Sequence, residues 1–577
     1  MRTIRFLLTA GAFLATALGT QPTSKAADIS KVPTAPEIAA IKSLGWDKAA
    51  FQLGGVLRTA YKSTSGTDPA FGRWRRIQQW CAFLDQAKYP KDGTAEIPTA
   101  IVDEFMGDES LSYQLFANLR AEDDASKVLG TLAAIRQAKP EAWKVYKALA
   151  IAVAVVFDRN RPDSWPHHQV KSSAVPLESD SVTNVERFNF WLESDTAGKL
   201  MLDIKKLEVE QIKFIVDTWI SFDELRWAQK NVRFPRNDFG RAFSCINYDT
   251  PRYEEGKLSW LGDSYKLVDI EKTGGICIDQ AYYAWTSGKA RGLPSILFVG
   301  EGNRGAHAWF GYMKSDDHWE LNEGRYSYDN YATGSARDPQ TGKKMTDHDL
   351  LYLASRFRNR PEYLTARFHV EMADLFKASS DLPREKAAIE TAIGICPNDA
   401  DAWDRRTDIL KGTGATPVQM TQHYEAAIRQ FSRNADLKAE YTTKYVALLR
   451  ETGQTDMADK LERSVVSANS KERTDLSMDT ANRKMKELMK EGKWEEAYKQ
   501  LDWAMGKLGK ASSGPVFSDM LTPFVRDAKK ADQLELAWKA LRTAGRALTL
   551  QSDDYRDEYA AMEESVKKAI KEQKKTN

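Results

Sequence analysis

The chain has 577 residues, a formal net charge of +2 and 28% charged residues. A chain of this length typically forms roughly three or four domains. Because acidic and basic residues nearly balance, the composition does not favour a dedicated nucleic-acid surface, which would need a local excess of Lys and Arg.

The first 26 residues have the parts of a secretory signal peptide. Met1-Arg2-Thr3-Ile4-Arg5 is short and basic, residues 6–19 are an apolar run too short to span a bilayer comfortably, and Ser24 and Ala26 supply small residues for cleavage. We therefore predict a signal peptide over residues 1–26 and an exported protein, periplasmic or secreted. No Cys follows the apolar run, and no later stretch is long and apolar enough for a membrane helix. We expect no membrane anchor after cleavage.

Residues 27–215 are predicted to form a mainly helical N-terminal region. A helix is expected over residues 140–157, with Glu141 near its start. Residues 158–180 are rich in Pro, Ser and His and predict a long loop, which a compact domain usually keeps for a functional site. Ser221-Phe222-Asp223-Glu224 fits a capping box for the helix that leads into the next region.

Residues 216–370 carry the candidate catalytic side chains. Gly274-Gly275 breaks the preceding element, and the helix that follows is predicted to hold Cys277 in its first turn, where the helix dipole favours a thiolate. Strands are expected at residues 295–300, at 306–313, where His307 and Ala308 point to opposite faces, and from residue 318. Asn322 follows on the third strand.

Cys, His and a carboxamide in this order can perform acyl transfer. Cys277 is predicted to be the nucleophile, His307 the base and then the acid, and Asn322 the residue that orients the imidazole. The Cys277 backbone N–H, near a helix N-terminus, is expected to help hold the oxyanion. No cofactor is required for this chemistry.

Gly275-x-Cys277, the Gly292-Leu293-Pro294 break, His307-Ala308-Trp309 and the Trp-x-Leu-Asn strand resemble the transglutaminase-like superfamily over roughly residues 216–335. The resemblance implies an α+β fold with a papain-like core, and thiol acyl transfer at an amide: peptide hydrolysis, deamidation or Gln–Lys crosslinking. The family usually has Asp where this chain has Asn322, although an Asn can also orient a neutral imidazole. For the upstream oxyanion-hole side chain of the family, Asn247 and Tyr248 are the nearby polar candidates.

The remaining cysteines and histidines indicate no metal site. Beside Cys277 the chain has Cys81, Cys245 and Cys396, among which at most one disulfide can form. No CxxC or calcium-loop pattern is present, and the adjacent pair His167-His168 has no further ligands at zinc spacing. We expect the pair to lie in a polar loop.

Residues 371–577 are predicted to form tetratricopeptide-like helical repeats. Ala497, Leu501 and Ala504 recur as the triplet Ala537-x3-Leu541-x2-Ala544, and Gly453 with Ala458 repeats the start of the unit. Small and apolar residues at this spacing form the packing face of a helical hairpin. A non-repeating helical bundle is the alternative.

Two functions of different classes follow. The first is an exported thiol enzyme that acts on a protein or peptide substrate, with hydrolysis favoured over crosslinking because water is always available as an acceptor. The second is a non-catalytic scaffold that binds protein partners on the concave surface of its repeats. The sequence leaves the oligomeric state open.

Overall fold

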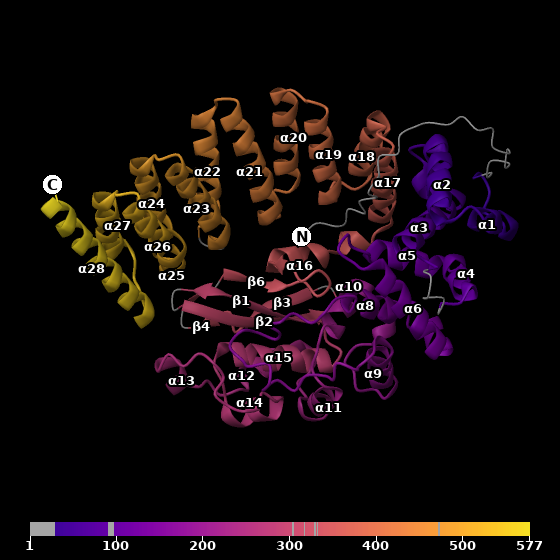
Figure 1. The fold of residues 1–577 in the computed structure, drawn as a ribbon, viewed down its shortest axis with the longest axis horizontal. Coiled ribbons are helices and arrows are strands. Elements are labelled where there is room, and N and C mark those ends of the chain that lie inside the picture. The colour runs from indigo at the N-terminus through magenta and orange to yellow at the C-terminus, as the bar shows by residue number, and fades with distance from the viewer. Residues whose placement is uncertain are drawn as a thin grey trace.

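The computed structural model describes residues 29–90, 97–302, 305–316, 318–327, 330–331, 333–470 and 473–576. The predicted signal peptide lies outside these ranges. Figure 1 shows a central sheet, with helices of the N-terminal half beside and below it and the C-terminal helices arching over its other side. Within the described ranges, no helix has both the length and the apolar character needed to cross a membrane.

The N-terminal region is helical, as predicted. Its elements are α1 (Ala35–Lys42), α2 (Trp46–Ala60), η1 (Ser65–Thr67), α3 (Pro69–Gln86), α4 (Thr99–Gly107), α5 (Glu109–Asn118), α6 (Ala125–Ala138), α7 (Pro140–Val145), α8 (Lys147–Val156), α9 (Asn184–Thr196), η2 (Ile204–Lys206) and α10 (Val209–Val216).

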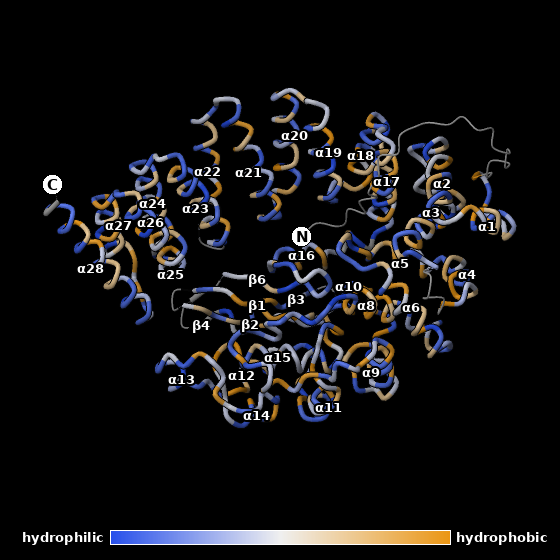
Figure 2. The backbone as a smooth tube through the Cα atoms, in the orientation of Figure 1, coloured by the Kyte–Doolittle hydropathy of each residue, from blue (hydrophilic) through white to orange (hydrophobic). Residues whose placement is uncertain are grey.

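The single helix expected over residues 140–157 is in fact two helices, α7 and α8, which are separated at Tyr146. The helices on the two sides of the break differ in burial. The α7 turn is partly exposed at Val145, whereas α8 is buried on all sides from Leu149 to Val156 and is apolar along its length (Figure 2). Residues 158–180 form a long connection without helix, as predicted. This connection packs against the segment that precedes the candidate nucleophile: Trp260 N donates a hydrogen bond to Gln169 O, and Tyr265 N donates one to Ala174 O.

Short helices lead into the sheet. They are α11 (Phe222–Asn231), η3 (Arg236–Asp238), α12 (Arg241–Ser244), α13 (Thr250–Glu254), α14 (Leu267–Thr273) and α15 (Cys277–Ala290). Only half of the capping box expected at α11 forms. Ser221 Oγ accepts from Glu224 N at 3.4 Å, but the Glu224 carboxylate accepts from Leu267 N instead of turning back to the cap. The Glu224 side chain therefore forms a tertiary hydrogen bond with Leu267 instead of the local capping bond that the sequence pattern predicts.

The sheet is antiparallel, with the order β3-β2-β1-β6-β7, which confirms the α+β class. Its strands are β1 (Ser295–Gly302), β2 (Gly305–Ser315), β3 (His318–Glu323), β6 (Thr333–Arg337) and β7 (Lys344–Met345), and β4 (Tyr326–Ser327) pairs separately with β5 (Asn330–Tyr331). The pairing of β1 with β2 runs from Ser295 opposite Tyr312 to Gly302 opposite Gly305.

The two faces of the sheet are covered by different parts of the chain. Phe310 and Tyr312 join the cluster that contains α15, whereas Trp309 joins a second cluster with Phe214 of α10 and Leu350 of α16 (Asp347–Leu353). This is the alternation predicted for β2. His307 therefore starts the strand on the Trp309 side, and Ala308 starts it on the α15 side.

The C-terminal region consists of paired helices. They are η4 (Arg356–Asn359), α17 (Pro361–Ala378), α18 (Leu382–Ile395), α19 (Ala400–Gly412), α20 (Pro417–Gln430), α21 (Ala435–Glu451), α22 (Thr455–Asn469), α23 (Thr474–Lys490), α24 (Trp494–Leu508), α25 (Ser513–Val516), the π-helical turn η5 (Phe517–Leu521), α26 (Thr522–Lys530), α27 (Leu534–Ala547) and α28 (Asp553–Thr576). The paired array begins at Pro361, before the boundary expected at residue 371.

The repeat triplets lie where the spacing predicts. Ala497, Leu501 and Ala504 are buried on α24, and their counterparts on α27 are buried in the same cluster. The turns that precede α22 and α24 contain Gly453 and Gly492, both with φ near +75°. A backbone in this left-handed region favours Gly, which has no Cβ to clash.

The helical array contacts the rest of the molecule at both ends. At its start, α17 to α19 share one continuous core with the N-terminal helices and α15. At its end, Ser518 Oγ donates to Glu301 Oε2 at 3.1 Å, and Tyr555 donates to the other oxygen of the same carboxylate, at the tip of β1. The arch over the sheet in Figure 1 is thus attached at both ends.

Candidate active site

Cys277 is the first residue of α15, and the chain before it is shaped by two glycines. Gly274 has φ +79°, and a Cβ there would lie 2.5 Å from Asn247 O. A Cβ on Gly275 would lie 2.4 Å from Asp279 Cβ. Both positions therefore need glycine, so that the backbone can approach α15 closely enough for Asp279 Oδ2 to accept from Ile276 N at 2.9 Å.

Asp279, in the first turn of α15 two residues after Cys277, is the centre of a buried polar network. Arg252 Nη1 donates to Asp279 Oδ2 at 2.8 Å, and Tyr265 Oη donates to Oδ1 at 2.8 Å. The ring of His167 in turn lies 2.9 Å from Tyr265 Oη through Nε2. His167, expected to lie in a polar loop, is thus a buried member of this network. The network fixes the first turn of α15 and thereby the direction of Cys277.

The surroundings of Cys277 favour the neutral thiol. Burial, with a smaller contribution from the Asp279 carboxylate, raises the pKa of Cys277 to about 11, although the backbone N–H groups of Ala308, Ile278 and Cys277 itself oppose the shift. The sequence-based expectation was a thiolate favoured by the helix dipole. Burial and a neighbouring carboxylate outweigh the dipole because its effect amounts only to about 0.3–1 kcal/mol.

The Cys277 thiol contacts the strand that carries His307. The thiol interacts with the N–H of Ala308, the residue that follows His307 on β2. His307 Nε2 lies 2.7 Å from the carbonyl oxygen of Gly324, which can only accept, so Nε2 carries the proton and Nδ1 keeps its lone pair. Burial lowers the pKa of His307. In the described residues no hydrogen bond joins the thiol to the ring, and burial favours the neutral form of each group.

Asn322 is not brought to His307. Its Oδ1 accepts from Arg325 Nη1 at 3.1 Å, and its side chain is exposed. The backbone of the same turn supplies the contact to the imidazole instead, through Gly324 O. Gly324 has φ +79°, and a Cβ there would meet the Phe243 ring at 2.3 Å. No side-chain pattern could have indicated this contact, because every residue carries a carbonyl group.

Arg325 links the Asn322 turn to the His307 strand and to the helical array. Its guanidinium lies 4.9 Å from the centroid of the Trp309 ring, which stacks with the His307 ring at 6.2 Å and an interplanar angle of 20°. Arg325 Nη1 also donates to Asp347 Oδ2 of α16 at 2.6 Å. This ion pair and the stack hold the turn against the sheet.

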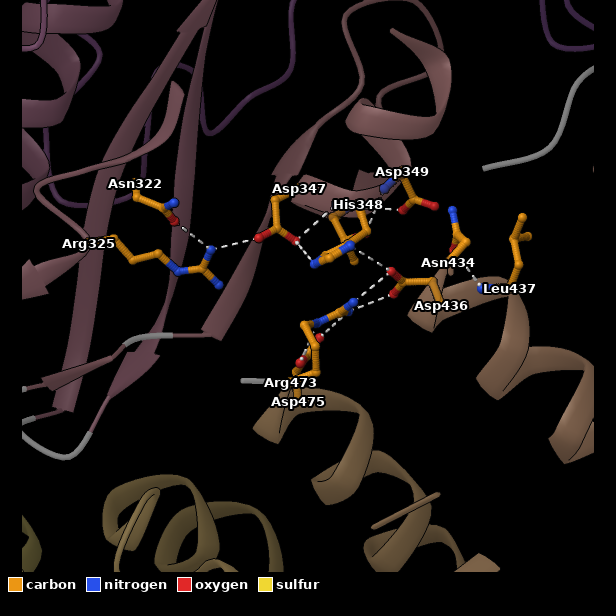
Figure 3. A network of polar contacts seen from close by, with 11 residues as sticks. Asn322, Arg325, Asp347, His348, Asp349, Asn434, Asp436, Leu437, Arg473 and Asp475 are labelled. Carbon is orange, nitrogen blue, oxygen red and sulfur yellow. Dashed lines mark hydrogen bonds and ion pairs between the residues drawn. The ribbon is translucent and has the colours of Figure 1, made fainter. Parts of the chain in front are cut away.

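Figure 3 shows that the same network continues into the repeats. The His348 ring lies between two carboxylates, with Nε2 3.8 Å from Asp347 Oδ1 and Nδ1 3.5 Å from Asp436 Oδ2 of α21. Arg473, which precedes α23, donates to both oxygens of Asp436 at 2.7 Å and pairs with Asp475 at 2.7 Å. The position of the Asn322 turn is therefore coupled to the position of α21 and α23.

The two polar residues considered for the oxyanion site lie beside the nucleophile. Tyr248 forms a parallel β-bridge with Gly275, and Asn247 O accepts from Gly275 N at 2.9 Å. Among the described residues no backbone carbonyl accepts from the Cys277 N–H. This N–H at the start of α15 and the exposed Tyr248 side chain are candidate donors to a carbonyl group attacked by Cys277.

All four cysteines are free thiols. Cys81 and Cys396 are buried, and Cys245, just after α12, is exposed. In the part of the chain that the structure describes, no group of three or more His, Cys, Asp or Glu side chains is placed to hold a metal ion.

The fold is thus that of an α+β protein in which a helix with an N-terminal cysteine packs on an antiparallel sheet, followed by an array of paired helices. Compared with known protein families and with curated proteins, the sequence matches none of them.

Proposed function

We propose that the protein is an exported cysteine hydrolase of the transglutaminase-like type, which cleaves amide bonds in a protein or peptide. The observation that supports this proposal best is the placement of Cys277. Its thiol stands at the start of α15 beside the N–H of Ala308, and the preceding residue of β2 is His307, whose Nε2–H is held by Gly324 O. The ring thus keeps an unprotonated Nδ1 as the base for a neutral thiol.

The reaction begins from the neutral pair. As Cys277 Sγ adds to the amide carbon, its proton passes to His307 Nδ1, and the charge that develops on the amide oxygen is held by the Cys277 N–H. Return of the proton from Nδ1 to the nitrogen of the leaving amine breaks the C–N bond and leaves a thioester. Water then gives a proton to Nδ1, adds to the thioester carbon, and releases the carboxylic acid and the thiol.

Two sets of hydrogen bonds hold Cys277 and His307 in position during these steps. Asp279, held by Arg252 and Tyr265, fixes the first turn of α15. Gly324 O holds the imidazole, so Asn322 contributes little while it is bonded to Arg325. The arch of paired helices over the opposite face of the sheet offers the protein substrate an extended surface.

The test is turnover of a fluorescence-quenched peptide library. Cys277→Ala and His307→Ala are expected to abolish cleavage, while Asn322→Ala is expected to lower kcat by less than about tenfold. Cys245→Ala is the matched control, because it removes an exposed thiol outside the proposed site. Cleavage that persists in purified Cys277→Ala would rule out the mechanism.

A non-catalytic scaffold is the second candidate, and the raised thiol pKa of Cys277 favours it. In that case the core serves as a structural domain, and the helical array binds the partners. The scaffold predicts that Cys277→Ala leaves every binding property unchanged and that wild-type protein cleaves no member of the library.

A further inference from the structure

A cavity of about 220 Å³ lies away from the candidate active site, where the N-terminal helices, α10 and the first paired helix meet. We call it the seam cavity and define it by Arg75 of α3, Tyr113 of α5, Glu210 of α10, Leu353 of α16, Arg358 of η4 and Tyr363 of α17. Tyr113 is 37% exposed, so the cavity reaches the surface at that side.

The seam cavity is lined by a cation, Arg358, that forms no salt bridge within the described residues. The Arg358 guanidinium lies over two tyrosine rings, 5.8 Å from the Tyr352 centroid and 5.4 Å from that of Tyr363. No hydrogen bond or salt bridge within the described residues reaches its side chain. The other arginines of the wall differ in this respect: Arg76 pairs with Glu371, and Arg367 pairs with Asp399 and Asp401.

Glu210 supplies an anion to the same cavity. Burial would raise the pKa of Glu210, but Lys213 and Arg120 hold it at about 2, so the side chain is a carboxylate at neutral pH. Both cations pair with Oε2 of Glu210, Lys213 Nζ at 2.7 Å and Arg120 Nη2 at 3.3 Å. The other oxygen, Oε1, is buried and has no hydrogen-bond partner. An ionised oxygen left in this state costs free energy until a donor reaches it.

Arg358 and Glu210 both line the seam cavity and influence each other's charge state. Burial opposes the charged form of Arg358, but Tyr363, Tyr352 and the carboxylates of Glu210 and Asp401 raise its pKa, and the Arg358 guanidinium in turn helps to lower the pKa of Glu210. Within the described residues no salt bridge joins Arg358 to Glu210, so the lining offers a cation and an anion that are not paired with each other. The rest of the lining is partly apolar, with Phe116, Val209 and Leu364 among its residues.

We propose that the seam cavity binds a free aliphatic α-amino acid. The ligand carboxylate pairs with Arg358, whose planar fork suits a two-point contact, and the ligand ammonium donates to Glu210 Oε1. The volume is below the roughly 300–1,000 Å³ of pockets that take drug-sized ligands, and this limits the occupant to about the size of leucine. The apolar lining takes the side chain.

Such binding would join three parts of the chain, because the walls come from the N-terminal helices, from α10 beside the sheet, and from the start of the helical array. Since α10 also packs against the sheet through Phe214, the ligand would stiffen the seam that positions the array over the core. The proposal does not depend on the proposed function, because it concerns binding alone.

The test is isothermal titration calorimetry of the full-length protein with L-leucine, L-leucinamide and N-acetyl-L-leucine at neutral pH. We expect L-leucine to bind and each analogue, which lacks one of the two charges, to bind at least about tenfold more weakly. Equal affinity for all three, or no heat with L-leucine, would overturn the proposal.

Two variants and a control locate the site. Arg358→Gln and Glu210→Gln are each expected to weaken L-leucine binding at least about tenfold. Arg360→Gln, which removes an exposed guanidinium two residues from Arg358, should leave the affinity unchanged. Unaltered affinity in a folded Arg358→Gln protein would refute the site. If that variant fails to fold, Arg358→Lys serves instead, since it keeps the charge and loses the two-point contact.

Discussion

The thiol of Cys277 is expected to react slowly at neutral pH and quickly only in alkali. With a pKa of about 11, roughly one molecule in a thousand carries the thiolate at pH 8, against roughly one in four for an ordinary thiol of pKa ~8.5. Because only the thiolate is alkylated, the rate at pH 8 should be roughly two hundred times lower than that of an ordinary thiol. Below pH 10 the rate should rise about tenfold per pH unit.

Asp279→Asn is the perturbation that tests the cause. Removing the carboxylate takes away the charge that opposes the thiolate and leaves the Arg252 cation, so the pKa of Cys277 should fall and alkylation at pH 8 should become several-fold faster. The assay is a pulse of iodoacetamide followed by mass spectrometry. The same sample reports the alkylation of the exposed Cys245, whose rate Asp279→Asn should leave unchanged.

Two results would refute this reasoning. One is labelling of Cys277 that persists as a plateau at about pH 5–6 and is lost in His307→Ala, because it would show a thiolate–imidazolium pair in the resting protein. The other is an unchanged Cys277 rate in folded Asp279→Asn, because the carboxylate would then have no influence on the thiol.

Three further perturbations have defined outcomes. Arg252→Ala leaves the Asp279 carboxylate buried without its cation, and urea unfolding should show a loss of about 3–5 kcal/mol; a loss below about 1 kcal/mol would contradict the structural role. Burial raises the pKa of Glu301 above its unfolded value, so burying this carboxyl group against the last helices contributes to stability fully below pH ~4.3, and the contribution is lost as pH rises through the raised pKa. The protection of residues 513–530 against hydrogen exchange, corrected for the intrinsic pH dependence of exchange, should therefore fall from pH 4 to pH 8 in the wild type and change less with pH in Glu301→Gln; identical profiles would exclude this role. Leu541→Ala, at a fully buried site, should cost about 2–5 kcal/mol, while Met457→Ala, 43% exposed, should cost under about 0.5 kcal/mol; similar losses would mean that α27 is not a core helix.

The elements of the fold could be predicted where local chemistry and periodicity agree. The two glycines, the helix from Cys277 and the strand with His307 each carry a local signal, and so do the repeated triplets of α24 and α27. Two predictions from local patterns were wrong. Glu224 leaves its cap for Leu267 N, and the helix expected over residues 140–157 breaks at Tyr146.

The candidate site could be predicted only in part. The sequence indicated Cys277 and His307, because nucleophile and base are side chains of distinctive chemistry. It could not indicate that Gly324 O would hold the imidazole, nor that Arg325 would hold Asn322. Every residue has a backbone carbonyl, so the sequence does not show which carbonyl will bind the imidazole. Whether the Asn322 amide bonds to His307 or to Arg325 depends on where the turn after β3 packs.

By itself the sequence determined the order of the elements, the faces of β2 and the chemistry available to Cys277 and His307, since all of these follow from residue type and spacing. Only the tertiary structure decided the protonation states and the coupling between distant segments. Burial beside Asp279 keeps the thiol neutral, and the seam cavity brings Glu210 and Arg358 into one lining. Electrostatic free energies depend on the distance between charges and on the water excluded around them, and neither quantity exists until segments far apart in the chain have packed together.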